Sequence, residues 1–376
     1  MLTINEEQKL LKASVRDFLT SRSPVAALRK LRDEKSPEGI DRQLWVGMCE
    51  MGLSGLTILE AYGGLDFGYL GLGQLLEETG RTLTASPLIS TVLLATTAIN
   101  LTGSEAQKKS LLPKLALGQM IIALAHEEKA HHHPSHVATK AKLQGKGYVL
   151  NGHKTFVLDG HIADKMFVVA RTEGKVDEPK GIALFLVNAD AKGLTVERTQ
   201  MMDSRNAAKI ILDNVLVPED QRFELGNYDT LVKIYDIGCI GLAAEMLGSA
   251  QECFERTLAY LKERQQFGVP IGSFQALQHR AAKMFIDIEL SKSVVIKALQ
   301  AIDNNAPDLS QLASLAKAKL GETIQLVSNE AIQMHGGIGM TDDAEIGFFL
   351  KRARVAQQIL GDGPYHLDRY ARLRGF

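Results

Sequence analysis

The segment from residue 140 to residue 217 constrains the fold most, because it holds strand-type runs with no helical period between them. KAKLQGKGYVLNGHKTFVLDG (140–160) alternates short extended runs with turns, and its Asn151-Gly152 dipeptide is typical of a hairpin turn. The runs that follow are rich in Val, Ile and Leu and are separated by Gly, Asp or Asn: KMFVVART (165–172), GIALFLVN (181–188), LTVERTQ (194–200) and AAKIILDNVLV (207–217). Strands at this spacing predict an antiparallel sheet or barrel.

Helical periods lie on both sides of this segment. Thr3 and Glu6 have the spacing of a capping box that would open a first helix. Further apolar periods at helical spacing cover 42–60, 70–82 and 87–101 in the first third, and four long stretches ending at 264, 303, 334 and 358 in the last third. We therefore predict an α+β fold. Its parts are an N-terminal helical domain (1–118), a central antiparallel β-sheet domain (119–225) and a C-terminal four-helix bundle (226–376).

Composition excludes several classes of protein. The net charge of the 376 residues is -1, which offers no electrostatic attraction for nucleic acid or for an anionic membrane. The three cysteines are widely spaced and form no CxxC, so a disulfide framework or a zinc site is disfavoured. The start, MLTINEEQ, is acidic and unlike a signal peptide, and no apolar run reaches the length of a membrane helix. No dinucleotide fingerprint follows a strand, which disfavours a nicotinamide dehydrogenase. We expect a cytoplasmic protein, or an organellar one already processed.

The stretch QMHGGIGM (333–340) ends a strong helical pattern with two adjacent glycines and a third. Glycine closes helices because it adopts the left-handed conformation without strain. A backbone without side chains also lets a large polar group such as a phosphate come close. The motif alone leaves both explanations open.

Two motifs together are informative. LKERQQFGVPIGSFQALQHRAAKM (261–284), followed at this distance by QMHGGIGM, resembles the acyl-CoA dehydrogenase family. The resemblance covers the whole chain, since helical domain, β domain and helical bundle is that family's order. It implies FAD as cofactor and α,β-dehydrogenation of an acyl-CoA thioester. A carboxylate removes the α-proton, and the electrons leave through an electron-transferring flavoprotein. It also implies at least a dimer, and a homo- or hetero-tetramer as the common assembly.

The resemblance also implies which residues contact FAD. The groups from the bundle are Arg264, Phe267, Gln275, Gln333, Gly336 and Gly337, which in this family reach the flavin cofactor of a neighbouring subunit. Arginine suits this role because its guanidinium is always charged and forks onto phosphate oxygens. Each residue also has an ordinary alternative role. Arg264 could be a solvated helix-end arginine, Phe267 a packing residue and Gln275 an exposed helix residue.

The central domain departs from the family pattern. Where the family has T-E-P-x-x-G-S-D, this chain has AHEEKAHHHPSHVATKA (125–141), without the Gly-Ser pair. The consecutive histidines 131–133 lack ordered ligand spacing, so we expect a solvated loop that binds no catalytic metal and contributes no metal ligand. At the family's W-I-T, Phe156 could still pack on the flavin ring, whereas Leu158 cannot form a hydrogen bond to it.

The catalytic base is also displaced. Leu360 stands at the family's common glutamate position, and Gly238 stands at the position that a minority uses. Asp362, between two glycines, is the candidate base that remains near the first position. The competing interpretation of Asp362 is a turn residue at a helix end.

These departures are asymmetric, because groups that would reach a neighbour's flavin are kept and groups of the chain's own flavin pocket are altered. The pattern resembles small subunits of heteromeric acyl-CoA dehydrogenases, such as pimeloyl-CoA dehydrogenase and steroid side-chain enzymes. We predict such a subunit. The alternatives are a homotetrameric enzyme with Asp362 as base, and a scaffold that has lost dehydrogenation.

Overall fold

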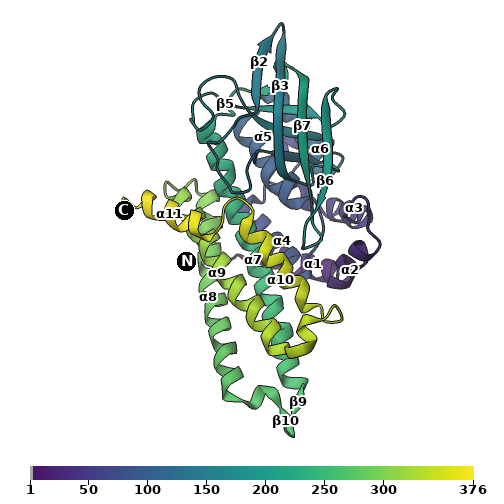
Figure 1. Cartoon of the computed structure of the whole chain (residues 1–376). Helices are drawn as coiled ribbons and strands as arrows, with labels where there is room; N and C mark the ends of the chain where they lie inside the picture. Colours follow the sequence, from purple (N-terminus) through teal and green to yellow (C-terminus); the bar gives the residue numbers. More distant parts are fainter. Residues whose placement is uncertain (1–2) are drawn as a thin grey trace. The chain divides into compact units, whose positions relative to one another are not determined.

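The computed structural model describes residues 3–376, and its elements follow the predicted order of helices, strands and helices (Figure 1). The described residues form two compact units. One comprises the chain up to Glu34, Tyr69–Thr84 and Cys239–Phe376, and the other comprises Lys35–Gly68 and Ala85–Gly238. The predicted domain limits at 118/119 and 225/226 stay predictions.

The first third is helical. The elements are α1 (Glu6–Arg22), α2 (Val25–Asp33), α3 (Arg42–Glu50), η1 (Leu53–Gly55), η2 (Glu60–Tyr62), α4 (Gly68–Thr82), the π-helix η3 (Leu88–Ala95), α5 (Thr96–Thr102) and α6 (Glu105–Ala116). The predicted capping box was misplaced by two residues. Asn5 and Gln8 form it, because the Asn5 side chain accepts from the Gln8 amide at 2.8 Å and Gln8 Oε1 accepts from the Asn5 amide at 2.9 Å.

The central region is an eight-stranded sheet. Its strands are β1 (Ile122–Ala125), β2 (Lys140–Gln144), β3 (Gly147–Leu158), β4 (Lys165–Arg171), β5 (Ile182–Asn188), β6 (Leu194–Gln200), β7 (Asn206–Pro218) and β8 (Arg222–Phe223). The order is β6-β7-β3-β2-β4-β5-β8, with β1 added beside β4. Most pairs are antiparallel as predicted, whereas β1 and β2 each run parallel to β4.

The hairpin predicted at Asn151-Gly152 was wrong. The turn between β2 and β3 lies at residues 145 and 146, where Gly145 has φ +62°. Gly152 lies inside β3 at a shift in its register with β7. A Cβ at Gly152 would lie 2.5 Å from Thr139 Oγ1, so this glycine is required by a close approach of backbone rather than by a turn.

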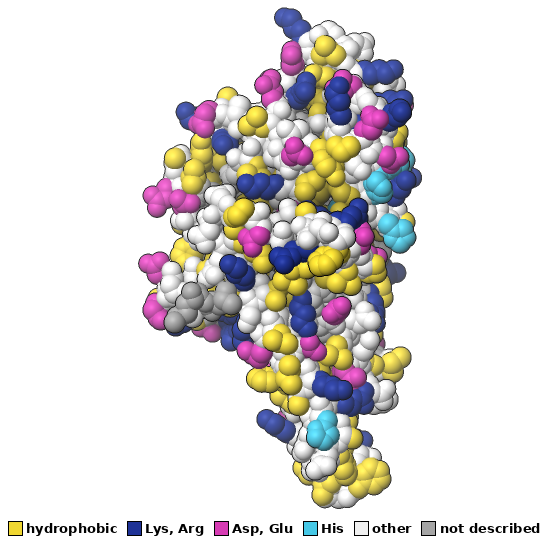
Figure 2. Space-filling model, turned by 90° about the vertical axis from the view of Figure 1, so that its left-hand side faces the viewer, with side chains coloured by type: hydrophobic (Ala, Val, Ile, Leu, Met, Phe, Trp, Pro, Cys, Tyr) yellow, Lys and Arg dark blue, Asp and Glu magenta, His cyan; other side chains and the backbone are white. Residues whose placement is uncertain are grey.

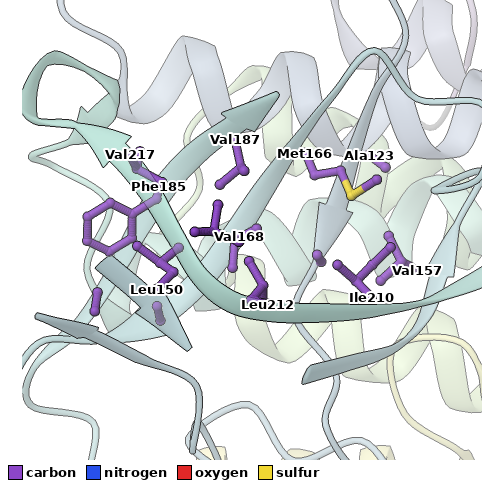
Figure 3. Close-up of a cluster of buried hydrophobic side chains, with 14 of the residues drawn as sticks. Ala123, Leu150, Val157, Met166, Val168, Phe185, Val187, Ile210, Leu212 and Val217 are labelled. Atoms are coloured by element: carbon purple, nitrogen blue, oxygen red, sulfur yellow. The ribbon is translucent and has the colours of Figure 1, made fainter. Parts of the chain in front are cut away.

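The sheet's alternating apolar residues form one buried core (Figure 3). Leu150 and Val157 of β3 meet Met166 and Val168 of β4 and Phe185 of β5 in this cluster. The continuous burial of β4 and β5 follows from their apolar runs, since both faces of these strands are covered.

The last third consists of long helices (Figure 1). They are α7 (Tyr228–Glu263), α8 (Gln275–Asp303), α9 (Leu309–His335), α10 (Ile346–Gln358) and α11 (Gly363–Leu373), with the small hairpin β9 (Gln265–Gln266) and β10 (Val269–Pro270) between α7 and α8. The 3-10 turns η4 (Glu219–Gln221), η5 (Ile271–Ser273) and η6 (Gly336–Met340) connect elements. The predicted helix periods correspond to α7–α10, and α11 was missed. Among residues 3–376, no helix combines the length and apolar character that a membrane crossing requires.

Candidate functional site

The β9–β10 hairpin presents the first group of predicted FAD contacts. α7 ends at Glu263, and Arg264 follows with its guanidinium exposed and without a hydrogen bond or ion pair to any described residue. The turn residues Phe267 and Gly268 have φ +54° and +79°, which matches the turn type that closes two-residue hairpins. Phe267 is 92% exposed, an unusual state for an aromatic side chain in a strained conformation. This hairpin is therefore built to present groups outward.

The QMHGGIGM segment presents the second group. α9 ends at His335, and Gly336 follows with φ +62°, so the predicted helix stop is confirmed. No heavy atom lies within 4 Å of a Cβ placed at Gly336 or Gly337, so this backbone faces open space. Gln333 in the last turn of α9 is exposed, as is Gln275 at the start of α8. The close approach of a phosphate remains a prediction.

A contact that the sequence analysis missed joins these two groups. Tyr260, one turn before Arg264, stacks on His335 with ring centroids 4.3 Å apart. The Tyr260 hydroxyl also donates to the His335 carbonyl at 3.3 Å. The end of α7 and the end of α9 are thereby held together, which places the free guanidinium and the open glycines on one part of the bundle. Figure 2 shows hydrophobic side chains at the end of the bundle that carries the hairpin.

Phe156 and Leu158 belong to the other compact unit. Phe156 has φ +50° at a register shift of β3 and is 52% exposed, so its ring is available for packing. Leu158 pairs with Ala207 at the end of β3 and is half-buried. The Thr155 amide donates to the Glu127 carbonyl at 2.7 Å, which fixes the histidine-containing loop beside this strand end.

In that loop, His132 turns inward rather than lying in solvent as expected. His132 Nδ1 lies 2.5 Å from Glu127 Oε1, and His126 Nδ1 lies 3.4 Å from the same oxygen. The Tyr235 ring packs on the His126 ring, with ring centroids 4.4 Å apart. It meets the His132 ring edge-on, with centroids 5.6 Å apart. Two imidazoles, a carboxylate and a phenol ring therefore fill this part of the unit. His131 and His133 are exposed, as predicted for the loop.

Asp362 caps α11. Its Oδ1 accepts from the Tyr365 amide at 2.9 Å, and its Oδ2 has no hydrogen-bond partner within residues 3–376. The preceding residues Leu360 and Gly361 have φ +57° and +102°, so the chain bends sharply between α10 and α11. Asp362 thus has the position of a turn residue, and only one of its two carboxylate oxygens is used in capping α11. Its role as base stays a prediction.

Three buried polar side chains hold this bend, and the sequence analysis identified none of them. Lys317 Nζ of α9 donates to the carbonyls of Gln357 (3.0 Å) and Gly361 (2.7 Å). The Leu360 carbonyl is contacted by His366 Nε2 (2.9 Å) and Cys239 Sγ (3.6 Å). Burial lowers the pKa of Lys317 to about 8, although Cys239 and Asp362 act to raise it. The only signal in the sequence was a lysine on the apolar face of a predicted helix.

Comparison with known proteins decides the family. The N-terminal, middle and C-terminal domain models of acyl-CoA dehydrogenase match residues 5–119, 123–215 and 232–373. The probable acyl-CoA dehydrogenase YngJ of Bacillus subtilis is 31% identical over 97% of this chain and 97% of its own length. The chain belongs to the acyl-CoA dehydrogenase family. This family is flavin-dependent, its members are oxidoreductases acting on CH–CH bonds, and the predicted fold class is confirmed.

Solved structures agree with this assignment. The steroid acyl-CoA dehydrogenase Tcur3481–Tcur3483 superposes with a TM-score of 0.89 at 32% identity, over 99% of this chain and 98% of that one. The ChsE4–ChsE5 complex of Mycobacterium tuberculosis gives a TM-score of 0.91 at 25% identity, over 100% and 99%. Both are assemblies with two named components.

Proposed function

We propose that this chain is one subunit of a heteromeric acyl-CoA dehydrogenase. An FAD molecule bound mainly by a partner chain of the same family is contacted by residues of this chain. These residues are Arg264, Gln275, Gln333 and the glycines at the end of α9. The observation that carries the proposal is a contrast. The end of α7 presents the exposed, unpaired cation Arg264 and the end of α9 presents open glycine backbone, whereas the loop at 126–132 is filled by its own side chains.

The bundle residues fit a dinucleotide. A pyrophosphate needs a fixed positive charge and a backbone that lets it come close. The free guanidinium of Arg264 and the uncovered glycine segment offer these two features. The Tyr260–His335 stack keeps these two features in one place. We therefore assign to this chain the binding and orientation of the cofactor's phosphate part.

The histidine loop does not fit the cofactor. The Gly-Ser pair that would offer small donors is absent, and the side chains of His126, Glu127, His132 and Tyr235 pack against one another there. Burial raises the pKa of Glu127, but His126 and His132 offset this and hold it below the ordinary value, so the carboxylate is charged at neutral pH. We infer that the compact unit that carries the sheet (Lys35–Gly68 and Ala85–Gly238), here named the β unit, holds no FAD, although Phe156 remains available to pack on a ring.

The reaction is α,β-dehydrogenation of an acyl-CoA. FAD, when bound, accepts the hydride, and an electron-transferring flavoprotein removes the electrons. Asp362 is the residue of this chain that could take the α-proton, through its unpartnered Oδ2. The proposal places the enzyme in the cytoplasm, in keeping with three cysteines that are all free.

Cofactor stoichiometry tests the proposal. The chain purified alone should carry little FAD, and co-purification with its acyl-CoA dehydrogenase partner should give less than one FAD per chain together with dehydrogenase activity. One FAD per chain in the isolated protein, with activity, would instead establish a homo-oligomer with Asp362 as base. A co-purified pair without FAD and without activity would leave only the scaffold role.

A further inference from the structure

Three side chains with metal-binding atoms converge in the β unit outside the groups assigned to FAD. His126, Glu127 and His132 each offer one ligand atom, and all three atoms lie within 4.8 Å of one another. In a tetrahedral zinc site, bonds of about 2.0–2.2 Å place ligand atoms roughly 3.3 Å apart. The His126–Glu127 separation of 3.4 Å already has this value, and the His132–Glu127 separation of 2.5 Å needs to open by less than about 1 Å.

His126 is the buried member of the cluster. Its side chain is only 4% exposed. The ring nitrogen that faces the cluster is Nδ1, which lies 3.4 Å from Glu127 Oε1. A ligand atom is therefore already held inside the protein, on the side of the ring where the carboxylate lies.

The charge states suit a cation. A neutral imidazole offers a nitrogen lone pair to a metal ion, and the cluster contains two such rings. The Glu127 carboxylate supplies negative charge. The nearest buried cation, Lys154, is balanced by Glu128, because Lys154 Nζ lies 2.7 Å from Glu128 Oε1.

The loop that carries the cluster is held at both ends. Lys154 Nζ donates to the His126 carbonyl at 3.1 Å, and Glu128 accepts from the amides of Ala138 and Thr139 at 2.7 and 3.0 Å. The buried Arg171 donates through Nε to the Val137 carbonyl at 3.0 Å. These bonds fix the backbone on either side of His132, so the ligands need little rearrangement to close on an ion.

We propose that His126, Glu127 and His132 form a binding site for a divalent transition-metal ion, with Zn²⁺ as its occupant. Two imidazoles and one carboxylate are a ligand set that zinc accepts with a fourth position left for water. The proposed site differs from the expectation that the loop contributes no metal ligand. That expectation rested on the consecutive histidines 131–133, whereas the proposed ligands have the spacing His126-Glu127-x₄-His132. The site is separate from the FAD contacts of the bundle and does not rest on the heteromer.

Metal analysis of the full chain tests the site. The protein should be purified without a histidine tag and in buffers free of chelator, and its zinc content measured by mass spectrometry. We expect stoichiometric Zn²⁺ in the wild type. Zn²⁺ affinity, measured by competition with a chromophoric chelator, should fall more in His132→Ala and Glu127→Gln than the roughly 10–100-fold typical of losing an outer-shell partner.

His131→Ala is the matched control, because His131 is exposed and adjacent in the same loop. It should bind Zn²⁺ as the wild type does, and added Zn²⁺ should raise the thermal midpoint of both proteins but not of His132→Ala. A wild type that neither carries nor binds Zn²⁺ would overturn the proposal, and this result does not depend on the folding of any variant. Equal loss of Zn²⁺ affinity in His131→Ala and His132→Ala would also overturn it, because the ion would then be held by the surface histidines.

Discussion

Arg264 and Asp362 are single residues whose surroundings define their possible chemistry. The Arg264 guanidinium is exposed and unpaired among the described residues, so its contribution to the isolated chain's stability is small. Asp362 has one oxygen engaged in capping α11 and one without a partner. Substitutions at these positions therefore separate binding from folding.

Arg264→Ala should weaken FAD retention in the assembled enzyme without unfolding the chain. A charged hydrogen bond to phosphate contributes about 1.5–3 kcal/mol, which corresponds to roughly ten- to hundredfold in affinity. FAD titration of the assembled complex measures the effect, and Lys262→Ala, which removes a nearby exposed cation, is the control. An unchanged FAD affinity in Arg264→Ala would remove this residue from the site.

Asp362→Asn should lower turnover by roughly a hundredfold or more while FAD content stays constant, in line with the contribution of a general base. Asparagine caps helices about as well as aspartate, so α11 should remain intact. Steady-state kinetics of the complex, together with its absorbance spectrum, report both quantities. If turnover barely changes, the base belongs to the partner chain and Asp362 serves only the turn.

Lys317 should make stability depend on pH. Its pKa falls from 10.5 to about 8 on folding, because burial disfavours the charged form. Between these values the unfolded chain binds a proton that the folded chain lacks, so stability rises with pH at up to about 1.4 kcal/mol per unit. Between pH 7.5 and pH 9.5, the thermal midpoint of the wild type should rise relative to that of Lys317→Met. Parallel shifts in the two proteins would show that Lys317 does not titrate in this window.

At the scale of elements, the β2–β3 hairpin contains two glycines with different structural roles, Gly145 and Gly152. Gly145 closes the turn with φ +62° and has open space around it, whereas Gly152 lets β3 pass close to Thr139. The hairpin preference of Asn-Gly predicted a turn at Gly152, but in the structure β3 continues through this residue and pairs with β7.

Gly145→Ala should therefore cost only about 1 kcal/mol, the strain of a left-handed alanine. Gly152→Ala should cost more, because its Cβ would lie 2.5–2.8 Å from atoms of Thr139 and would displace the strand. Thermal unfolding of the two variants, matched in chemistry, gives the comparison. A larger loss at Gly145 would mean that the turn rather than the close approach limits this hairpin.

At the scale of the whole molecule, the chain exposes apolar groups that its own fold does not use. Phe267 at the hairpin tip is 92% exposed, and Phe274 lies edge-on to it at 6.1 Å. Exposed aromatic side chains of this kind mark surfaces that another chain covers.

Phe267→Asn should weaken assembly while leaving the isolated chain as stable or more stable. Asn-Gly suits the two-residue turn better than Phe-Gly does, so the substitution should stabilise the hairpin while it removes an apolar contact from the interface. Sedimentation of the complex and thermal unfolding of the chain alone measure the two effects. Leu143→Ser, at another exposed apolar site in β2, is the control. Unchanged assembly in Phe267→Asn would place the interface elsewhere.

The sequence by itself determined which stretches became helices and strands. β4, β5 and β6 and the long helices α7 to α10 follow their apolar periods closely, because periodicity reflects which face of an element is buried. The motifs around Arg264 and Gly336 likewise indicated the family, since their spacing is local to short segments of chain. The capping residues of α1 and the turn before β3 were missed by a few residues, where several polar or glycine residues compete for one role.

Only the tertiary structure decided how distant segments meet. It set β1 and β2 parallel to β4, turned His132 toward His126 and Tyr235, and stacked Tyr260 on His335. It also brought Lys317 to the carbonyls of residues 357 and 361. Each of these contacts depends on chain packing rather than on neighbours in sequence, because a buried polar group takes whichever partner the fold brings within hydrogen-bonding distance.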